Sequence, residues 1–417
     1  MTGVTPHFAD DHLTVYQGDA ATVLASLPAE SVHCVVTSPP YWGLRDYGVS
    51  GQLGLEPTPE EYVANLVAVF REVRRVLRVD GTLWLNLGDS YAGSYSGHSL
   101  RPEGGEQRPG QPGFQAIRDG RYPKREPNVP GLKPKDLVGI PWRVAFAFQA
   151  DGWYLRSDII WSKPNPMPES VTDRPTKAHE YLFLLSRSPR YYYDAEAVRE
   201  ASVGTNAHDL TGPGYVAPGQ TPQTGNRRSK KPDGWATHEG GHGSFHRDGR
   251  EVGEPGTIRA GRNLRDVWTI ATEPYPGAHF ATFPQKLVEP CVKVGTSERG
   301  VCPECGAPWR RETRATYDAQ GRTTNGPRSA ERKHQEHGTA GFGQRLVKST
   351  ETTGWQPGCA HGTEPVPATV LDPFAGSGTT GLVANRLGRR AVLIDLSMDY
   401  LGQLMDRNAQ TPLGLGA

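Results

Sequence analysis

The sequence Thr37-Ser38-Pro39-Pro40-Tyr41-Trp42 follows directly after the apolar run from Val32 to Val36. The run has the composition of a strand buried on both faces of a parallel sheet. Two consecutive prolines lack N–H donors and fix φ, so they cannot extend that strand. The chain must therefore turn at the carboxyl edge of the sheet, where ligands bind in open α/β folds. Taken alone, the hexapeptide is also compatible with a strand terminator that has no further role.

Strands and helices alternate around this point. A strand at Leu13–Gly18 precedes it, and a helix with Thr58 as N-cap follows it. Asp80-Gly81 is expected to turn the chain into a strand at Thr82–Leu87. This order predicts a doubly wound sheet. The later elements expected are the helix Trp142–Gln149, the strand Tyr154–Trp161, a strand pair of Glu180–Leu185 with Tyr191–Tyr193, and the helix Pro284–Val294.

Length and composition exclude several classes of protein. The chain has 417 residues and a formal net charge of +1, so no global basic field marks it as a nucleic-acid binder. An apolar signal core and a run of membrane-spanning length are both missing from the sequence, and five cysteines argue against a disulfide scaffold. We expect a cytoplasmic protein without membrane association. Three stretches rich in Gly, Pro and polar residues read as insertions rather than core elements.

A second signature lies near the end of the chain. A strand at Thr369–Leu371 leads into a loop that carries Gly376, Gly378 and Gly381, and the next strand ends at Asp395. The spacing G-x-G-x-x-G between a strand and a helix is typical of dinucleotide sites, so a nicotinamide or flavin enzyme is a rival interpretation. A triphosphate P-loop is disfavoured because no Lys follows Gly378. An adenosine carrying an amino acid fits these groups as well as a dinucleotide does.

The two signatures, in this order, resemble the amino-methylating DNA methyltransferases of the beta order. The resemblance implies an α/β fold, namely a circularly permuted Rossmann-like S-adenosylmethionine-dependent methyltransferase sheet with loop-rich insertions. It also implies a bacterial or phage-encoded enzyme that acts on double-stranded DNA, alone or beside a restriction endonuclease encoded separately. The expected organisation is a catalytic half at 10–95, an insertion at 96–136, core at 137–200, a candidate target-recognition insertion at 201–263, core at 264–296, a candidate zinc-binding insertion at 297–363, and the donor-binding half at 364–408.

The resemblance also implies roles for individual residues. The catalytic tetrapeptide is Ser38, Pro39, Pro40 and Tyr41. The residues matching the cofactor site are Asp19 near the adenine, Phe283 in the short segment before the glycine loop, Asp372, Phe374, Gly376 and Gly378 in the loop itself, and Asp395 at the ribose. For Asp19, a simple cap at the end of its strand is the alternative.

The chemistry of an exocyclic amine explains the tetrapeptide. The amine is a poor nucleophile because its lone pair is delocalised into the base. Hydrogen-bond acceptors aimed at the amino hydrogens localise that lone pair as charge develops, and Ser38 Oγ with the Pro39 carbonyl are suitable acceptors. Tyr41 offers a ring on which an extruded base stacks, and Trp42 is expected to line the pocket. Cys34 lies within a strand and is expected to be a core residue rather than a covalent nucleophile.

Serine in the first position of the tetrapeptide is the residue that cytosine-amine enzymes of this family usually carry. It favours methylation of cytosine N4 over adenine N6, which stays open as the alternative. More remote alternatives are an RNA or protein amide methyltransferase, a nicotinamide oxidoreductase, and a zinc-bearing DNA-binding protein without enzymatic activity.

Three of the five cysteines lie within the third insertion. Cys302 and Cys305 form a C-x-x-C pair, and Cys359 with His361 offers a second pair. Three thiolates and an imidazole are a recognised set of structural zinc ligands, and a small polar insertion gains folding energy from a metal. We therefore expect zinc with a structural role, with a dithiol pair or free thiols as the alternatives. The remaining cysteine, Cys291, is expected in the core, and His334 and His337 rank lower as ligands.

A neutral chain binds DNA when its basic residues cluster. The tract 201–263 holds such a cluster beside two aromatic residues, and the third insertion holds another. Either cluster is suited to phosphate contacts, and the position of the tract 201–263 in the family favours it for target recognition. The basic residues of this tract are Arg227, Arg228, Lys230, Lys231, Arg247, Arg250, Arg259 and Arg262.

Overall fold

The computed structural model describes residues 4–44, 51–92, 131–200, 257–259, 262–273, 283–320 and 345–409. They belong to two compact units. The larger unit comprises Met1–Val198, Asn263–Glu312 and Thr353–Ala417, and the smaller one comprises Arg199–Arg262 and Thr313–Thr352. The tetrapeptide, the predicted cofactor residues and the four predicted metal ligands lie in the larger unit. Within the described part of the chain, no helix is long and apolar enough to cross a membrane.

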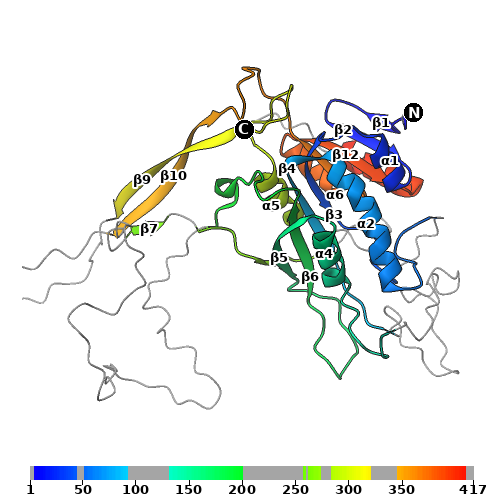
Figure 1. Cartoon of the computed structure of the whole chain (residues 1–417). Helices are drawn as coiled ribbons and strands as arrows, with labels where there is room; N and C mark the ends of the chain where they lie inside the picture. Colours follow the sequence, from blue (N-terminus) through cyan, green and yellow to red (C-terminus); the bar gives the residue numbers. More distant parts are fainter. Residues whose placement is uncertain are drawn as a thin grey trace, which may run out of the picture. The chain divides into compact units, whose positions relative to one another are not determined.

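The larger unit is built on one nine-stranded sheet of mixed direction (Figure 1). Across the sheet the order is β1 (Phe8–Ala9), β2 (Leu13–Gln17), β12 (Arg390–Asp395), β11 (Thr369–Asp372), β3 (Val32–Thr37), β4 (Leu77–Leu87), β6 (His179–Ser186), β5 (Tyr154–Ser162) and β8 (Val267–Thr269). The five strands from β2 to β4 run parallel, whereas β6 is antiparallel to both of its neighbours. The last strand of the chain, β12, pairs with the early strand β2. This pairing of the two ends of the chain confirms the permuted order.

The centre of the sheet contains a topological switch point. The chain passes from β3 to β4 in one direction across the sheet and from β11 to β12 in the other, while β11 and β3 are neighbours paired in parallel. In such a sheet the loops after the two central strands diverge and leave a crevice at the carboxyl edge, where ligands bind. The loop after β3 is the proline-containing turn, and the loop after β11 is the glycine loop.

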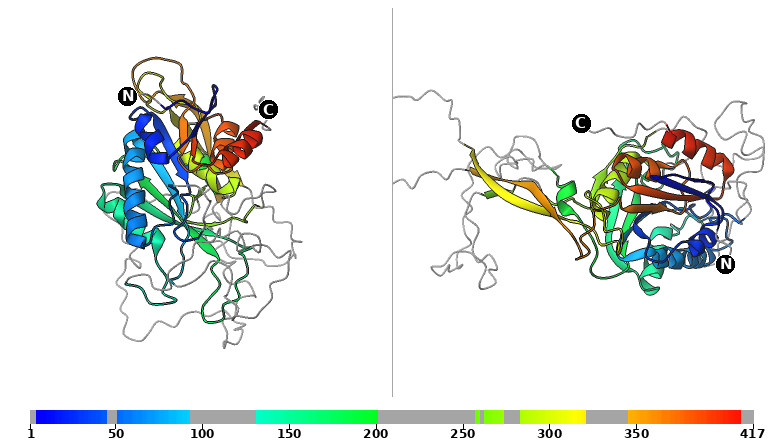
Figure 2. Two further views of the ribbon diagram at one scale, coloured as in Figure 1. Left: turned by 90° about the vertical axis from the view of Figure 1, so that its right-hand side faces the viewer. Right: turned by 90° about the horizontal axis from the view of Figure 1, so that it is seen from above.

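Helices cover both faces of the sheet (Figure 2). One core cluster packs α1 (Ala20–Ser26), α2 (Pro59–Val76) and α4 (Ile140–Ala150) on the sheet. The other packs α5 (Gln285–Gly295), α6 (Thr379–Arg386) and α7 (Met398–Ala409). Helix α2 begins as expected, because Thr58 Oγ1 accepts a hydrogen bond from the N–H of Glu61 at 3.2 Å and Pro59 occupies the first turn.

Two expectations about strands were wrong. Asp80-Gly81 is not a turn: strand β4 runs through it without interruption, and a register shift against β3 between Val32 and Cys34 absorbs the irregularity. Tyr191–Tyr193 is not a strand, because both edges of β6 are already occupied by β4 and β5. The segment instead leads into a short 3-10 helix at Ala195–Val198.

The third insertion contains regular structure that composition did not indicate. Strands β9 (Arg310–Gln320) and β10 (Arg345–Gln356) form a ribbon, and β7 (Thr257–Arg259) pairs with β10 in parallel. Residues 96–130 of the first insertion and 201–256 of the tract expected to recognise the target lie outside the described residues.

Candidate active site and metal-ligand cluster

The two loops of the switch point are joined through the buried carboxylate of Asp372. Thr37 Oγ1, at the end of β3, donates a hydrogen bond of 2.7 Å to Asp372, and Thr380 Oγ1, in α6, donates another of 2.7 Å. The N–H of Phe374 donates a third at 3.1 Å. Asp372 is 1% exposed, and burial raises its pKa to about 6 despite these donors. Asp372 therefore fixes the proline turn and the glycine loop relative to each other.

The tetrapeptide is organised by a hydrogen-bonded chain. Ser38 Oγ donates to the Tyr41 hydroxyl at 3.3 Å, and the Tyr41 hydroxyl donates to Glu180 Oε2 at 2.8 Å. Asn86 Nδ2 donates both to the Tyr41 oxygen at 2.6 Å and to Glu180 Oε2 at 3.0 Å. Because the Ser38 proton points to Tyr41, the lone pairs of Ser38 Oγ are left to accept other hydrogen bonds.

A buried ion pair anchors this chain. Lys163 Nζ donates to Glu180 Oε1, and the two side chains are 18% and 17% exposed. Burial alone would raise the pKa of Glu180, but the Lys163 ammonium and the hydrogen bonds from Lys163, Asn86 and Tyr41 lower that pKa below its usual value. Burial and the nearby Glu180 carboxylate raise the pKa of Tyr41 well above its ordinary value. Tyr41 is thus a neutral phenol held by an anionic carboxylate.

The proline turn is also held from its flanks. The Pro40 carbonyl accepts a hydrogen bond of 2.8 Å from the Tyr62 hydroxyl. Gly88 makes room for the Tyr41 ring, since a Cβ at this glycine would lie 2.6 Å from Tyr41 Cε2. No hydrogen bond from the described residues reaches the Pro39 carbonyl, which leaves it available as an acceptor.

Trp42 does not fit the expected place at the base pocket. The indole is 2% exposed and belongs to the core cluster beneath the turn. Its N–H donates a hydrogen bond of 2.9 Å to the Glu56 carbonyl. A large apolar ring is more stable when packed in the core than at a solvent-filled edge, and this placement gives Trp42 a supporting role under the tetrapeptide.

The glycine loop is tied to Asp395. The N–H of Gly376 donates to Asp395 Oδ2 at 2.7 Å, and the N–H of Ser397 donates to Oδ1 at 2.9 Å. Burial raises the pKa of Asp395, while hydrogen bonds from backbone N–H groups oppose that rise. Each oxygen of Asp395 retains acceptor capacity.

The two glycines expected to admit a ligand differ in their surroundings. Gly376 has φ of 50°, and a Cβ there would meet no atom within 4 Å, so the loop is open on this side. Gly378 has φ of 75°, and a Cβ there would lie 2.6 Å from Leu404 Cγ of α7. Close packing of α7 therefore requires Gly378, whereas Gly376 leaves space for a ligand.

The remaining predicted cofactor residues are Asp19, Phe374 and Phe283. Asp19 is exposed and caps α1, accepting a hydrogen bond of 2.9 Å from the N–H of Thr22. It lies beside the end of β12, because the neighbouring N–H of Gly18 donates to the Asp395 carbonyl at 3.0 Å. Phe374 packs against Phe70 with ring centroids 6.3 Å apart. Phe283, just before α5, packs against the core cluster on the other face of the sheet. Their roles in cofactor binding stay predictions.

Sequence reasoning missed Asn86, Lys163 and Glu180. A signal for two of them was present: Asn86 interrupts the apolar run of β4, and Glu180 stands near the start of the apolar strand β6. A polar side chain within a buried apolar strand requires a hydrogen-bonding partner. Asn86 and Glu180 are therefore candidates for residues that support a functional site.

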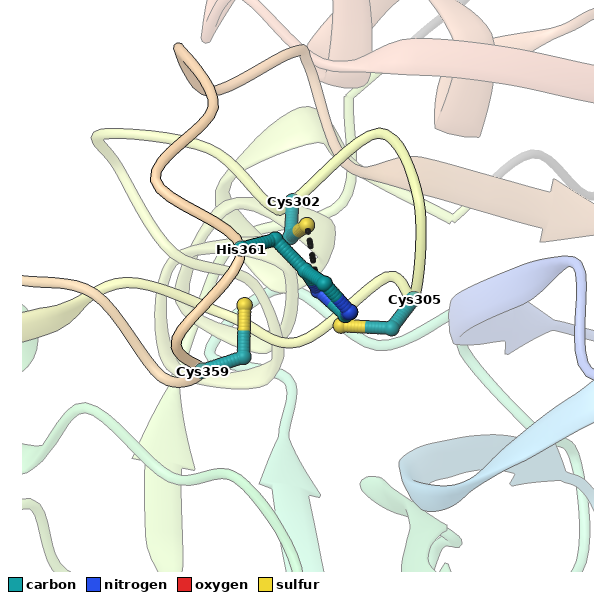
Figure 3. Close-up of side chains that lie close together, drawn as sticks. All are labelled: Cys302, Cys305, Cys359 and His361. Carbon is teal, nitrogen blue, oxygen red and sulfur yellow. Dashed lines mark hydrogen bonds between the residues drawn. The ribbon is translucent and has the colours of Figure 1, made fainter.

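The four predicted metal ligands come together. One ligand atom from each of Cys302, Cys305, Cys359 and His361 lies within 4.8 Å of all the others, and Figure 3 shows the three sulfurs gathered around the imidazole ring. Cys34 and Cys291 are each 0% exposed, which confirms them as core residues. The lower-ranked candidates His334 and His337 lie outside the described residues.

Comparison with known proteins shows relatives along nearly the whole chain. The N6/N4 methyltransferase family, described as DNA methylase, matches residues 32–302 and 328–406. Type II methyltransferase M.XycI of Xanthomonas campestris pv. cyanopsidis is 37% identical over 399 residues, covering 94% of this chain and 87% of that protein. Type II methyltransferase M.Cfr9I of Citrobacter freundii is 44% identical over 284 residues, covering 68% of this chain and 72% of that protein.

Among solved structures, PvuII DNA methyltransferase (cytosine-N4-specific) superposes with a TM-score of 0.51. The alignment covers 99% of this chain and 92% of that one at 15% sequence identity. At this identity the likeness shows that the fold is shared.

Proposed function

The chain belongs to the N6/N4 family of DNA methylases, and within that family we propose that it transfers the methyl group of S-adenosylmethionine to the N4 amine of cytosine in a base turned out of the DNA duplex. The family and the beta order make the protein an S-adenosylmethionine-dependent DNA methyltransferase. The choice of cytosine rests on Ser38, the first residue of the tetrapeptide. Its hydroxyl donates a hydrogen bond to Tyr41. Methylation of adenine N6 by the same site is the alternative.

The residues at the carboxyl edge fit the donor. Its adenosine and amino-acid parts need carboxylates for hydroxyl and amino hydrogens and a backbone that allows close approach. Asp19 and Asp395 supply carboxylates at neighbouring strand ends, and Gly376 opens the loop between them and the tetrapeptide. When bound there, S-adenosylmethionine supplies an activated methyl group.

Ser38 and Pro39 prepare the amine. In our proposal Ser38 Oγ and the Pro39 carbonyl each accept one amino hydrogen, which concentrates the lone pair on nitrogen as it forms the new bond. The hydrogen bond from Ser38 to Tyr41, and onward to the Glu180 anion, increases electron density on Ser38 Oγ, because successive hydrogen bonds polarise one another. Ser38 is thus a stronger acceptor than an isolated hydroxyl.

Positioning contributes the remaining catalytic effect. The proline turn is fixed by Asp372 on one side and by Tyr62 on the other, so the acceptors do not have to reorganise during the reaction. Tyr41 offers a ring whose hydroxyl is already held by Glu180 and Asn86, and we propose that the extruded base stacks on this ring. In this role Glu180 is a positioning residue that acts through Tyr41.

Relatives of this chain are named Type II methyltransferases, and we propose that this enzyme belongs to a restriction-modification system and protects DNA from a cognate endonuclease encoded separately. The partner is double-stranded DNA, and the tract 201–263 remains our candidate for target recognition.

The test is nucleoside mass spectrometry. Unmethylated DNA is incubated with the protein and a donor whose methyl group is deuterated, then digested to nucleosides. A deuterated N4-methyldeoxycytidine supports the proposal. A deuterated N6-methyldeoxyadenosine instead would retain the family and overturn the choice of base.

A further inference from the structure

We propose that Cys302, Cys305, Cys359 and His361 bind one structural Zn²⁺ that clamps the two ends of the β9–β10 ribbon to the amino-terminal edge of the catalytic sheet. This inference goes beyond the methyl-transfer reaction and does not depend on the identity of the methylated base.

The distances suit a tetrahedral metal. With Zn–S of about 2.3 Å and Zn–N of about 2.0 Å, tetrahedral geometry places two sulfurs ~3.8 Å apart and a sulfur and a nitrogen ~3.5 Å apart. Cys302 Sγ lies 3.5 Å from His361 Nδ1, and all four ligand atoms lie within 4.8 Å of one another. Three thiolates with one imidazole select zinc over magnesium or calcium, which take oxygen ligands.

The backbone around Cys302 has the form of a turn that presents two thiols. The N–H of Cys302 donates to the Ala307 carbonyl at 2.9 Å, and the N–H of Gly306 donates to the Cys302 carbonyl at 2.8 Å. Gly306 has φ of 68°, a left-handed conformation that allows the chain to reverse immediately after Cys305.

Outer groups support the ligands on both sides. The Thr363 hydroxyl lies 3.4 Å from Cys302 Sγ, where it stabilises a thiolate by hydrogen bonding. The Glu304 carboxylate lies 4.0 Å from His361 Nε2, the ring nitrogen left over when Nδ1 binds a metal. Metal-binding histidines commonly direct their second nitrogen to a carboxylate in this way.

The cluster is fastened to the edge of the sheet opposite the active site. Arg78, near the start of β4, donates a hydrogen bond of 2.5 Å to the Cys305 carbonyl. Val301 exchanges two backbone hydrogen bonds of 2.8 and 2.9 Å with Val366, just before β11. The glycine loop follows the other end of β11, and the tetrapeptide follows the other end of its parallel neighbour β3, whose six residues span about 20 Å. The metal is therefore structural and takes no part in methyl transfer.

The ligands flank the ribbon in sequence. Strand β9 begins at Arg310, five residues after Cys305, and β10 ends at Gln356, three residues before Cys359. The residues from Pro303 to Arg311 and from Glu351 to Thr363 are exposed or half-buried, so apolar packing contributes little to holding these ends together. A metal that joins one pair of ligands before β9 to another after β10 replaces the missing core by closing the chain between them.

The test uses the full-length protein, purified without added metal. Elemental analysis should find one zinc per chain, as a single Cys₃His site requires. Cys305→Ser and Cys359→Ser should each lose that zinc, whereas His12→Ala, a control at an exposed histidine that is not part of the cluster, should keep it. Absence of zinc from the native protein, or full zinc content in the Cys305→Ser/Cys359→Ser double variant, overturns the site.

Two further measurements address the clamp itself and do not require the variants to fold. Removing zinc with a chelator should accelerate proteolytic cleavage within residues 297–363 by about tenfold or more and leave S-adenosylmethionine binding unchanged. Unchanged cleavage after zinc loss overturns the clamp. Replacement of the metal by Co²⁺ should give the intense absorption of tetrahedral thiolate-bound cobalt, and the weak absorption of octahedral cobalt would overturn the ligand assignment.

Discussion

Replacing Glu180 by glutamine tests whether the tetrapeptide depends on an anion behind Tyr41. The amide of Glu180→Gln is nearly isosteric with the carboxylate, and its oxygen still accepts the hydrogen bonds from Tyr41 and Asn86, which are 2.8 and 3.0 Å long in the native protein. Its NH₂ group, however, then faces the Lys163 ammonium, a second donor. The substitution therefore removes charge while largely preserving shape.

The expected magnitude follows from these contacts. A hydrogen bond to a charged acceptor contributes about 1.5–3 kcal/mol and one to a neutral acceptor about 0.5–1.5 kcal/mol, so removing the charge while keeping the bond costs about 1–1.5 kcal/mol. Each 1.4 kcal/mol of lost transition-state stabilisation costs a factor of ten, so turnover should fall by about 5- to 10-fold. The unpaired Lys163 should lower the unfolding free energy by about 2–4 kcal/mol, near the lower end for a broken buried pair. We choose the lower end because the two side chains retain 18% and 17% exposure and the ammonium lies 4.2 Å from the centroid of the Trp161 ring.

The assay compares the methylation rate on saturating DNA, the S-adenosylmethionine affinity measured by calorimetry, and the urea unfolding midpoint. Glu289→Gln is the matched control, since it removes a half-exposed carboxylate that pairs with Lys293 at 2.7 Å and should change stability by less than about 1 kcal/mol. The double variant Glu180→Gln/Lys163→Met should regain stability but not turnover. Native turnover in Glu180→Gln would refute the reasoning.

Three further predictions follow from the buried and close-packed groups of the site. Because burial raises the pKa of Asp372 from 3.8 to about 6, its stabilising contribution is complete below about pH 4 and is lost as the pH rises through 6. The unfolding free energy of Asp372→Asn minus that of the native protein should therefore be about 3 kcal/mol larger at pH 7 than at pH 4. The measurement is urea unfolding of both proteins at the two pH values, and a difference that does not change with pH would contradict the prediction. Gly88→Ala should displace the Tyr41 ring and reduce turnover without weakening donor binding, and native turnover would show that the ring position is unimportant. Gly378→Ala should lower the thermal unfolding midpoint by its collision with α7, whereas Gly376→Ala should chiefly weaken donor binding; equal effects of the two on both measurements would contradict their different surroundings.

The fold was predictable because its central elements have strong local signals. The apolar run before Ser38, the N-cap at Thr58 and the glycines after Asp372 each specify an element or its end, and the order of the two signatures along the chain specifies the permutation. The ribbon of β9 and β10 was not predictable, because its polar sequence lacks an alternation of apolar residues that marks a half-buried strand.

The site was predictable only in the parts that are contiguous in sequence. Glu180 reaches Tyr41 across 139 residues, and this contact depends on β6 entering the sheet beside β4, which no local pattern encodes. Trp42 shows the reverse error. Its position next to Tyr41 suggested a shared surface, but successive residues at a tight turn point in different directions, and the larger ring is buried.

Gly378 shows a further limit of motif reasoning. In the sequence it is equivalent to Gly376 as a glycine that admits a ligand. Only the structure shows that α7 occupies the space beside Gly378 and that Gly376 is open. A glycine pattern specifies where a Cβ is not tolerated and leaves open whether a ligand or another helix is the reason.

The most direct test of the account is the effect of Ser38→Ala on two quantities measured with one preparation: the rate of N4-methyldeoxycytidine formation and the affinity for S-adenosylmethionine. We expect the rate to fall by about 10²- to 10³-fold, as is typical when one preorganised hydrogen-bonding group is removed from the transition state. We also expect unchanged donor affinity, because the hydrogen bonds of Asp372 and Asp395 at the predicted donor site come from Thr37 and Gly376 and not from Ser38. A Ser38→Ala protein that forms the product at the native rate would contradict the central claim.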